Sequence, residues 1–267
     1  MVLQNIRKIL RLLVPQIFNS FRKNRNIHGD YQSYHQALLA SGGMGYVAGN
    51  LKLSDYVKSL RDTNDKEIWA WTTLSAILFS TSINKNNNNI TQIFDYGGGY
   101  GETYFQFREF LSCLNIMWIV VELKDKVAIA KNEGFEGENL KFMTTEDFDL
   151  LHSVRIDCLL LGGVLQYTEF PYDLLKNILK KKPSMVALDR TPVLDGSNNE
   201  ELFYIQEAPD FLGGSAHPLR IINRQNVENS LKDCGYKEYG EYDYGAFPRD
   251  YSKGRYVAQI WKLVLVS

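Results

Sequence analysis

The chain has 267 residues, of which 45% are hydrophobic and 23% charged, and its net charge at pH 7 is −1. This length and composition fit one globular domain with an added segment. The near-zero net charge gives no global field for nucleic acid, so we expect no nucleic-acid partner.

The cysteines and histidines argue against a metal site. Cys113, Cys158 and Cys234 lack metal-ligand spacing, and the four histidines form no His-x-x-His cluster. We therefore expect buried thiols in a reducing, cytoplasmic compartment, and no bound metal.

The first 29 residues are basic and amphipathic. They carry six Lys or Arg residues and no acid, and apolar residues recur at helical spacing. The apolar stretch is too short to span a bilayer, and no small-residue cleavage site follows it. Two interpretations stay open. One is a helix over residues 1–25 that lies on an anionic membrane, at its inner face; the other is a helix docked on the protein's own body.

Residues 30–89 complete an expected helical cover, so we divide the chain into segments 1–89 and 90–267. Helical patterns run over 31–39, 53–60 and 67–79, and a polar loop rich in asparagine follows at 84–89. Strand and helix patterns then alternate, which predicts a parallel sheet with right-handed crossovers. The predicted strands are 90–95, 117–122, 139–143, 156–161 and 184–189, and the predicted helices are 102–112, 125–133, 146–152 and 171–181.

A glycine-rich turn follows the first of these strands. The sequence reads Asp-x-Gly-x-Gly-x-Gly, with Asp95, Gly97, Gly99 and Gly101. Glycine allows a sharp turn and a close approach of the backbone to a ligand, and the helix that follows points its amides at the same place. A dinucleotide fingerprint needs a third glycine at position 102, where Glu102 stands, which disfavours an NAD-dependent oxidoreductase.

An acid ends the next predicted strand. Glu122 follows a continuous apolar run and lies 21 residues after Gly101, close to the spacing at which an acid meets a ribose in nucleotide-binding βαβ units. The chain ends with two longer strand patterns, at 236–244 and 255–266, which predict an antiparallel hairpin.

These features together resemble a known family. The glycine turn, the five-strand series and the hairpin resemble the Rossmann-like, seven-stranded sheet of class I methyltransferases that use S-adenosyl-L-methionine (SAM). The segments 27–37, 161–167 and 188–192 narrow the resemblance to methyltransferases of bacterial surface-polysaccharide and lipopolysaccharide gene clusters, over residues 27–267.

The resemblance implies a SAM site at the carboxyl ends of the strands. Asp95 would order the glycine turn, Gly97, Gly99 and Gly101 would let the backbone approach, and Glu122 would hold the ribose. The residues assigned to the adenine and to the space around the reactive sulfonium are Thr145, Asp147 and Gly162. The alternative for Asp147 is a simple helix-start charge.

An acceptor site is expected beside it. A hydroxyl acceptor needs a general base, for which His217 in a predicted loop is the first candidate and Asp189 and His35 are others. Arg190 would grip a phosphate or carboxylate of the acceptor. The remaining expected acceptor contacts are Gln166, Tyr167, Tyr31, Tyr204 and Gln206.

The sequence therefore predicts a SAM-dependent methyltransferase that O-methylates a small-molecule or glycan intermediate of cell-envelope polysaccharide synthesis. One alternative is a methyltransferase-like scaffold without catalysis in a polysaccharide complex, and the other is the oxidoreductase. The sequence does not fix the acceptor's identity, the methylated atom or the oligomeric state.

Overall fold

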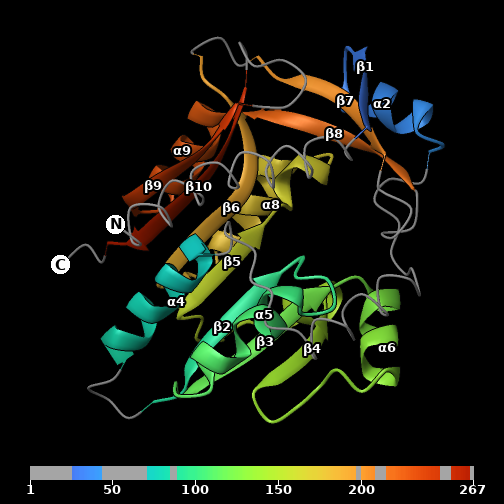
Figure 1. Ribbon diagram of the computed structural model, residues 1–267. Helices are drawn as coiled ribbons and strands as arrows, with labels where there is room; N and C mark the ends of the chain where they lie inside the picture. Colours follow the sequence, from blue (N-terminus) through green and yellow to red (C-terminus); the bar gives the residue numbers. More distant parts are fainter. Residues whose placement is uncertain are drawn as a thin grey trace, which may run out of the picture.

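The computed structural model describes residues 26–43, 71–84, 89–196, 200–207, 215–246 and 254–264. In these segments a mostly parallel sheet carries helices on both faces (Figure 1). The helices expected over 1–25 and 53–60 lie outside the described residues.

The main sheet is the one the sequence predicts. Its strand order is β4-β3-β2-β5-β6-β10-β9, and β10 runs antiparallel between β6 and β9. The strands are β2 (Thr91–Tyr96), β3 (Ile116–Glu122), β4 (Leu140–Thr144), β5 (Cys158–Gly162), β6 (Met185–Leu194), β9 (Tyr236–Ala246) and β10 (Arg255–Leu263). The chain leaves β2 toward β3 and β4, then returns to β5 on the other side. The strand order therefore reverses between β2 and β5, which is where open α/β sheets bind ligands.

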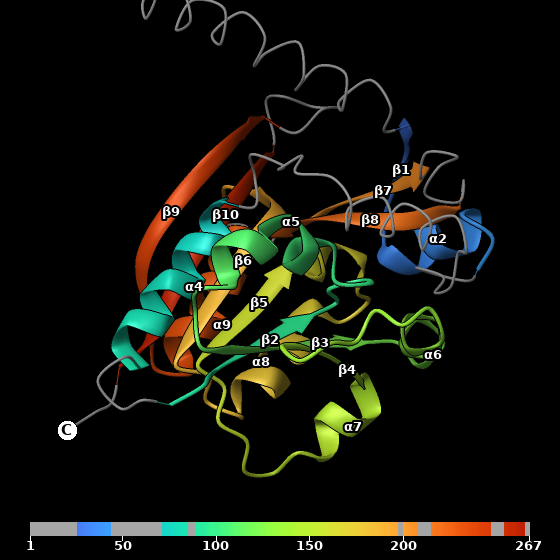
Figure 2. The ribbon, with the colours of Figure 1, turned by 60° about the horizontal axis from the view of Figure 1, so that its bottom comes forward.

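Helices cover both faces of this sheet (Figure 2). One face packs against α4 (Trp71–Asn84), α5 (Glu102–Leu111) and α6 (Lys124–Asn132). The other packs against α7 (Thr145–Leu150), α8 (Pro171–Leu179) and α9 (Arg224–Asp233).

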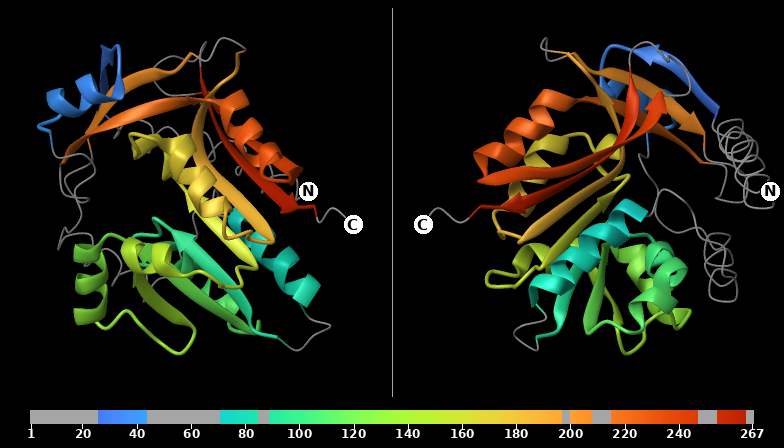
Figure 3. Two further views of the ribbon diagram at one scale, coloured as in Figure 1. Left: turned by 180° about the vertical axis from the view of Figure 1, so that it is seen from behind. Right: turned by 60° about the vertical axis from the view of Figure 1, so that its left-hand side comes forward.

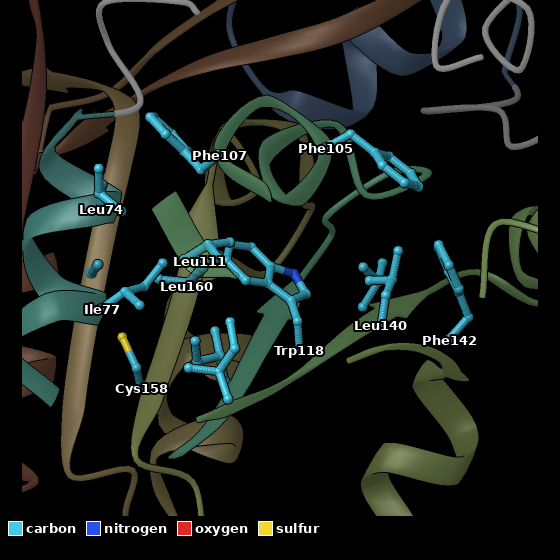
Figure 4. Packing of buried hydrophobic residues seen from close by; sticks show 14 of the residues in the cluster. Leu74, Ile77, Phe105, Phe107, Leu111, Trp118, Leu140, Phe142, Cys158 and Leu160 are labelled. Carbon is cyan, nitrogen blue, oxygen red and sulfur yellow. The ribbon is translucent and has the colours of Figure 1, made fainter. Parts of the chain in front are cut away.

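The apolar runs form strands because both sides of each strand are buried. In β3, Trp118 and Val120 enter the core under α4 and α5, whereas Ile119 and Val121 enter the core on the opposite face. Figure 4 shows Trp118 between Leu111 of α5 and Leu140 of β4. A continuous hydrophobic sequence is thus the expected pattern for a central strand.

A second, antiparallel layer extends from the end of β6 (Figure 3). It contains β1 (Asn26–Tyr31), β7 (Leu202–Glu207) and β8 (Ala216–Asn223), and α2 (Tyr34–Ala40) packs on it. β8 pairs with β6 at Val193–Ile222 and Leu194–Asn223, so the layer is continuous with the main sheet. The short η3 turn (Leu165–Tyr167), which follows β5, contacts β8.

This layer corrects three expectations. The helix predicted from residue 31 begins at Tyr34, because the preceding residues pair with β7 as strand β1. The expected all-helical cover over 1–89 therefore contains a strand. His217 lies in β8 and not in a loop, and Pro218 is tolerated beside it because β8 pairs with β6 only near its far end among the described residues.

The cysteines are also less uniform than expected. Cys158 is buried, Cys234 is partly buried and Cys113 is exposed. Burial raises the pKa of the Cys158 thiol to about 12.

Candidate functional site

The glycine turn lies at the reversal point of the sheet, directly after β2. Gly97, Gly99 and Gly101 all have positive φ, at 72°, 62° and 86°. Gly97 also has no room for a side chain, because an added Cβ would lie 2.5 Å from Cγ2 of Val164 in the turn after β5. The turns after β2 and β5 are therefore packed against each other, and this contact requires glycine at position 97.

Glu102, the first residue of α5, curls back into the turn. Its carboxylate accepts a hydrogen bond from the Tyr100 backbone N–H at 2.9 Å. An added Cβ on Gly99 would lie 2.4 Å from Glu102 Oε2, so the carboxylate occupies the side-chain space of that glycine. Burial raises the pKa of Glu102. Glu102, which replaces the third glycine of a dinucleotide fingerprint, therefore also shapes the turn.

Glu122 ends β3 and joins that strand to the glycine turn. Its Oε1 accepts hydrogen bonds from the Gly99 N–H at 3.2 Å and from Lys126 Nζ at 2.8 Å, and its Oε2 accepts the Leu123 N–H at 2.7 Å. Glu122 and Lys126 side chains are only 6% and 3% exposed, so this is a buried ion pair. Glu122 was predicted from the sequence as a site residue, whereas Lys126 was not. The spacing of four residues across the start of a helix is the signal that could have found it.

Asp95 lies beneath the turn. The carboxylate is buried, accepts Trp118 Nε1–H at 3.3 Å, and lies 2.5 Å from where a Cβ on Gly98 would be. Burial raises the pKa of Asp95 to about 7, against the opposing effect of the Arg190 charge. Glu102 and Glu122 raise this pKa further. Asp95, Glu102 and Glu122 therefore make the floor of the turn acidic.

The end of β5 and the middle of β6 form the neighbouring part of the site, because Gly162 pairs with Asp189 and β6 continues to Leu194 instead of ending at residue 189 as predicted. Gly163 N–H donates to the Asp189 carbonyl at 2.8 Å, and the Gln166 side chain donates to the Arg190 carbonyl at 3.1 Å. Asp189 is buried and accepts hydrogen bonds from Thr73 Oγ1 at 3.1 Å, from Tyr244 OH at 2.7 Å and from the Arg190 backbone N–H at 2.9 Å. The Asp189 carboxylate thus joins α4, β6 and β9, and it raises the pKa of Tyr244 after the larger effect of burial.

The second layer contributes two buried polar residues, Gln206 and His217, beside η3. Tyr167 OH donates to Gln206 Oε1 at 2.8 Å, and the rings of Tyr167 and His217 meet edge to face with centroids 5.0 Å apart. Tyr34 OH in turn donates to the Tyr167 carbonyl at 2.6 Å. The structure therefore joins three residues that the sequence named separately, Tyr167, Gln206 and His217, with two of them drawn from β7 and β8.

Other predicted residues lie apart from this group. His35 is exposed on α2, and Asp147 is exposed in the first turn of α7, where its N–H is capped by Thr144. Thr145, at the start of α7, donates to Glu146. The ring of Tyr31 lies against Gly29 of its own strand. Tyr204 of β7 is buried in a small hydrophobic cluster with Leu219 and Ile221 of β8.

The described part of the chain has neither a metal-binding cluster nor a membrane-spanning helix. Its His, Cys, Asp and Glu side chains form no group of three that could hold a metal ion. No helix there combines the length and apolarity needed to cross a membrane.

Comparison with known proteins gives similarity at the level of fold. No protein-family model matches the chain, and no curated protein matches it. Among solved structures, the N-terminal domain of EvdMO1 with S-adenosylhomocysteine (SAH) bound has a TM-score of 0.47 and 15% identity, covering 71% of this chain and 81% of its own.

Two further structures are similar. The 1,6-didemethyltoxoflavin-N1-methyltransferase of Burkholderia thailandensis has a TM-score of 0.44 and 16% identity, covering 90% of this chain and 96% of its own. A SAM-dependent methyltransferase of Clostridium acetobutylicum has a TM-score of 0.46 and 13% identity, and the match covers 79% of this chain and 97% of that protein. At these identities the similarity concerns the fold alone, and function has to be inferred from the site.

Proposed function

We propose that this protein is a SAM-dependent methyltransferase. The observation that carries the proposal is the hydrogen bond from the Gly99 N–H to the Glu122 carboxylate. It joins the positive-φ turn after β2 to the acid that ends β3, beside the point where the strand order reverses. The glycine turn, whose backbone a ligand could approach closely, therefore lies beside the Glu122 carboxylate, a group suited to bind a ribose.

The chemistry of the residues fits SAM. The cofactor supplies a methyl group on a sulfonium and carries an ammonium group, so it brings positive charge. Asp95 is a buried carboxyl and Glu102 a half-buried one, and burial raises the pKa of both, so a cationic ligand beside them would stabilise their charged forms. Gly97, Gly99 and Gly101 would lie against the methionine part. Glu122 would share its carboxylate with the ribose, Gly162 would leave space near the sulfonium, and Thr145 and Asp147 would flank the adenine.

The acceptor would bind over the end of β5 and the neighbouring middle part of β6. There the chain has to hold a hydroxyl in line with the methyl group and remove its proton. His217 is the preferred base over Asp189, because the Asp189 carboxylate already accepts hydrogen bonds from three different groups. Tyr167 would orient the His217 ring through their edge-to-face contact. Gln166, Arg190 and Tyr31 would contact the acceptor.

We further propose that the acceptor is a sugar or glycan intermediate of cell-envelope polysaccharide synthesis, methylated on oxygen in the cytoplasm. The support is the resemblance in segments 27–37, 161–167 and 188–192. Residues 1–25 would bring the protein to the inner membrane face. Deleting them should release the protein from anionic vesicles, and failure of the full chain to bind such vesicles would contradict this part.

One observation favours a second candidate, the scaffold without catalysis. Glu122 already accepts hydrogen bonds from Gly99, Leu123 and Lys126, so a ribose would compete for its lone pairs.

Calorimetric titration with SAH, with NAD as the control ligand, separates the candidates. We expect SAH to bind and NAD not to bind. Asp95→Ala should abolish SAH binding, whereas the matched variant Asp233→Ala, at an exposed site at the end of α9, should leave it unchanged. Binding of NAD alone would restore the oxidoreductase, and binding of neither ligand by the folded protein would favour the scaffold.

A further inference from the structure

β6 carries an irregularity where it reaches the site. Thr191 pairs with Val257 of β10 and Leu188 pairs with Gln259, so Asp189 and Arg190 both stand opposite the single residue Ala258. This two-against-one arrangement is a β-bulge, a feature that re-aims side chains next to functional sites.

The bulge holds Arg190 in a strained conformation. Its φ is +50°, a region that residues with a Cβ rarely adopt and that costs free energy. In a regular strand the side chains of Asp189 and Arg190 would point to opposite faces. Here Arg190 Nε lies 3.9 Å from Asp189 Oδ2, so the bulge has brought both side chains to the same side.

The end of β5 makes room for the guanidinium. Arg190 Nη2 lies 3.5 Å from the Gly162 carbonyl oxygen, and an added Cβ on Gly162 would lie 2.6 Å from this Nη2. The Gln166 side-chain amide holds the Arg190 backbone by donating a hydrogen bond to the Arg190 carbonyl oxygen. Arg190 thus starts on β6 and crosses the end of β5, and its charge lowers the pKa of Asp95 in β2. Its side chain stays 35% exposed, so it is accessible from solvent.

We infer that Arg190 is a binding residue for an oxyanion, a carboxylate or phosphate, carried by the acceptor. A guanidinium suits this group because its planar fork donates two parallel hydrogen bonds. The acceptor side is favoured over the cofactor because Arg190 starts on β6, two strands from the glycine turn, and its backbone is held by Gln166 of η3. This inference rests on the proposed function and narrows the acceptor to an anionic sugar or a similar anionic compound.

The test uses the full chain saturated with SAH. Glucuronate and glucose 6-phosphate are the charged probes, and glucose is the neutral control; binding is measured calorimetrically. We expect at least one charged probe to bind more tightly than glucose. Arg190→Gln should weaken that binding about 10- to 100-fold, the range for loss of charge-assisted hydrogen bonds. Equal binding of glucose and both charged probes, or unchanged binding in Arg190→Gln, would overturn the inference.

Two further variants keep the result interpretable. Arg190→Gly should lose the charged probe and still fold, because glycine adopts a φ of +50° without strain. Arg155→Gln removes an exposed arginine that pairs with Asp157 before β5, at the opposite end of the sheet, and it should change nothing at the site.

Arg190 could instead bind the carboxylate of the cofactor, and two cofactor analogues distinguish this case from binding of the acceptor. SAH has the methionine carboxylate and 5′-methylthioadenosine lacks it. If Arg190→Gln weakens SAH but not 5′-methylthioadenosine, Arg190 serves the cofactor and the inference fails while the proposed function stands. If SAH does not bind the unmodified protein, the proposed function itself fails.

Discussion

The buried ion pair between Lys126 and Glu122 allows a quantitative test of how the site is held together. We consider Lys126→Met, which keeps an unbranched side chain one atom shorter and removes its charge. The ammonium lies 2.8 Å from Glu122 Oε1, and both side chains are nearly inaccessible. The variant leaves Glu122 with two backbone N–H donors and no cation.

The expected cost is large because a buried charge would lose its partner. Removing one member of such a pair destabilises a protein by about 3–5 kcal/mol, whereas an exposed pair contributes about 0–1 kcal/mol. Two neighbours add to the effect. Lys126 lowers the pKa of Glu102, and Glu122 raises the pKa values of both Glu102 and Asp95, so the variant leaves three acids close together.

Urea denaturation followed by circular dichroism measures this cost. Lys126→Met should lower the free energy of unfolding by about 3–5 kcal/mol. Adding Glu122→Gln in the same chain should recover most of the loss, because the charge is then removed with its partner. A loss below about 1 kcal/mol in Lys126→Met would refute the argument, since that is the value for a solvent-screened pair.

Three further predictions concern single residues of the site. Stability should fall as pH rises from about 4 to 7, because folded Asp95, with its pKa of about 7 against an ordinary 3.8, keeps a proton that the unfolded chain has lost. The difference in pKa corresponds to roughly 4 kcal/mol of stability, and Asp95→Asn should flatten the pH dependence when denaturation is measured at several pH values. Gly97→Ala should destabilise the protein by about 1–3 kcal/mol through its φ of 72° and its clash with Val164, and a thermal melt matching the parent protein would contradict the described turn. His217→Gln should lower the methyl-transfer rate about 10²- to 10⁴-fold while SAH affinity stays constant, so full activity would remove His217 as the base.

Apart from β6, which runs on to Leu194, the predicted strands of the main sheet match the structure because their signals are local. The apolar runs that form β2, β3 and β5 are buried on both faces, and such strands need a continuous hydrophobic sequence wherever they lie in the sheet. The glycine turn is equally local, because a turn of only a few residues with positive φ needs glycine at those positions.

The second layer could not be recognised in this way. β8 contains Pro218 and a buried Arg220, which are unfavourable in an isolated strand. Arg220 is accommodated by Glu201 at 3.5 Å and by the Glu169 carbonyl at 2.9 Å, both distant in sequence. β1 likewise exists through its pairing with β7.

The sequence by itself determined the parallel α/β sheet, its terminal hairpin and the positions of Asp95 and Glu122 near the ends of β2 and β3, because hydrophobic periodicity and glycine spacing are local features of the chain. The tertiary structure decided what those residues contact. It buried Lys126 against Glu122, brought His217 to Tyr167, and turned Arg190 across Gly162 by means of a bulge against β10. Each of these contacts depends on where separate segments meet in space, and no short stretch of sequence encodes that.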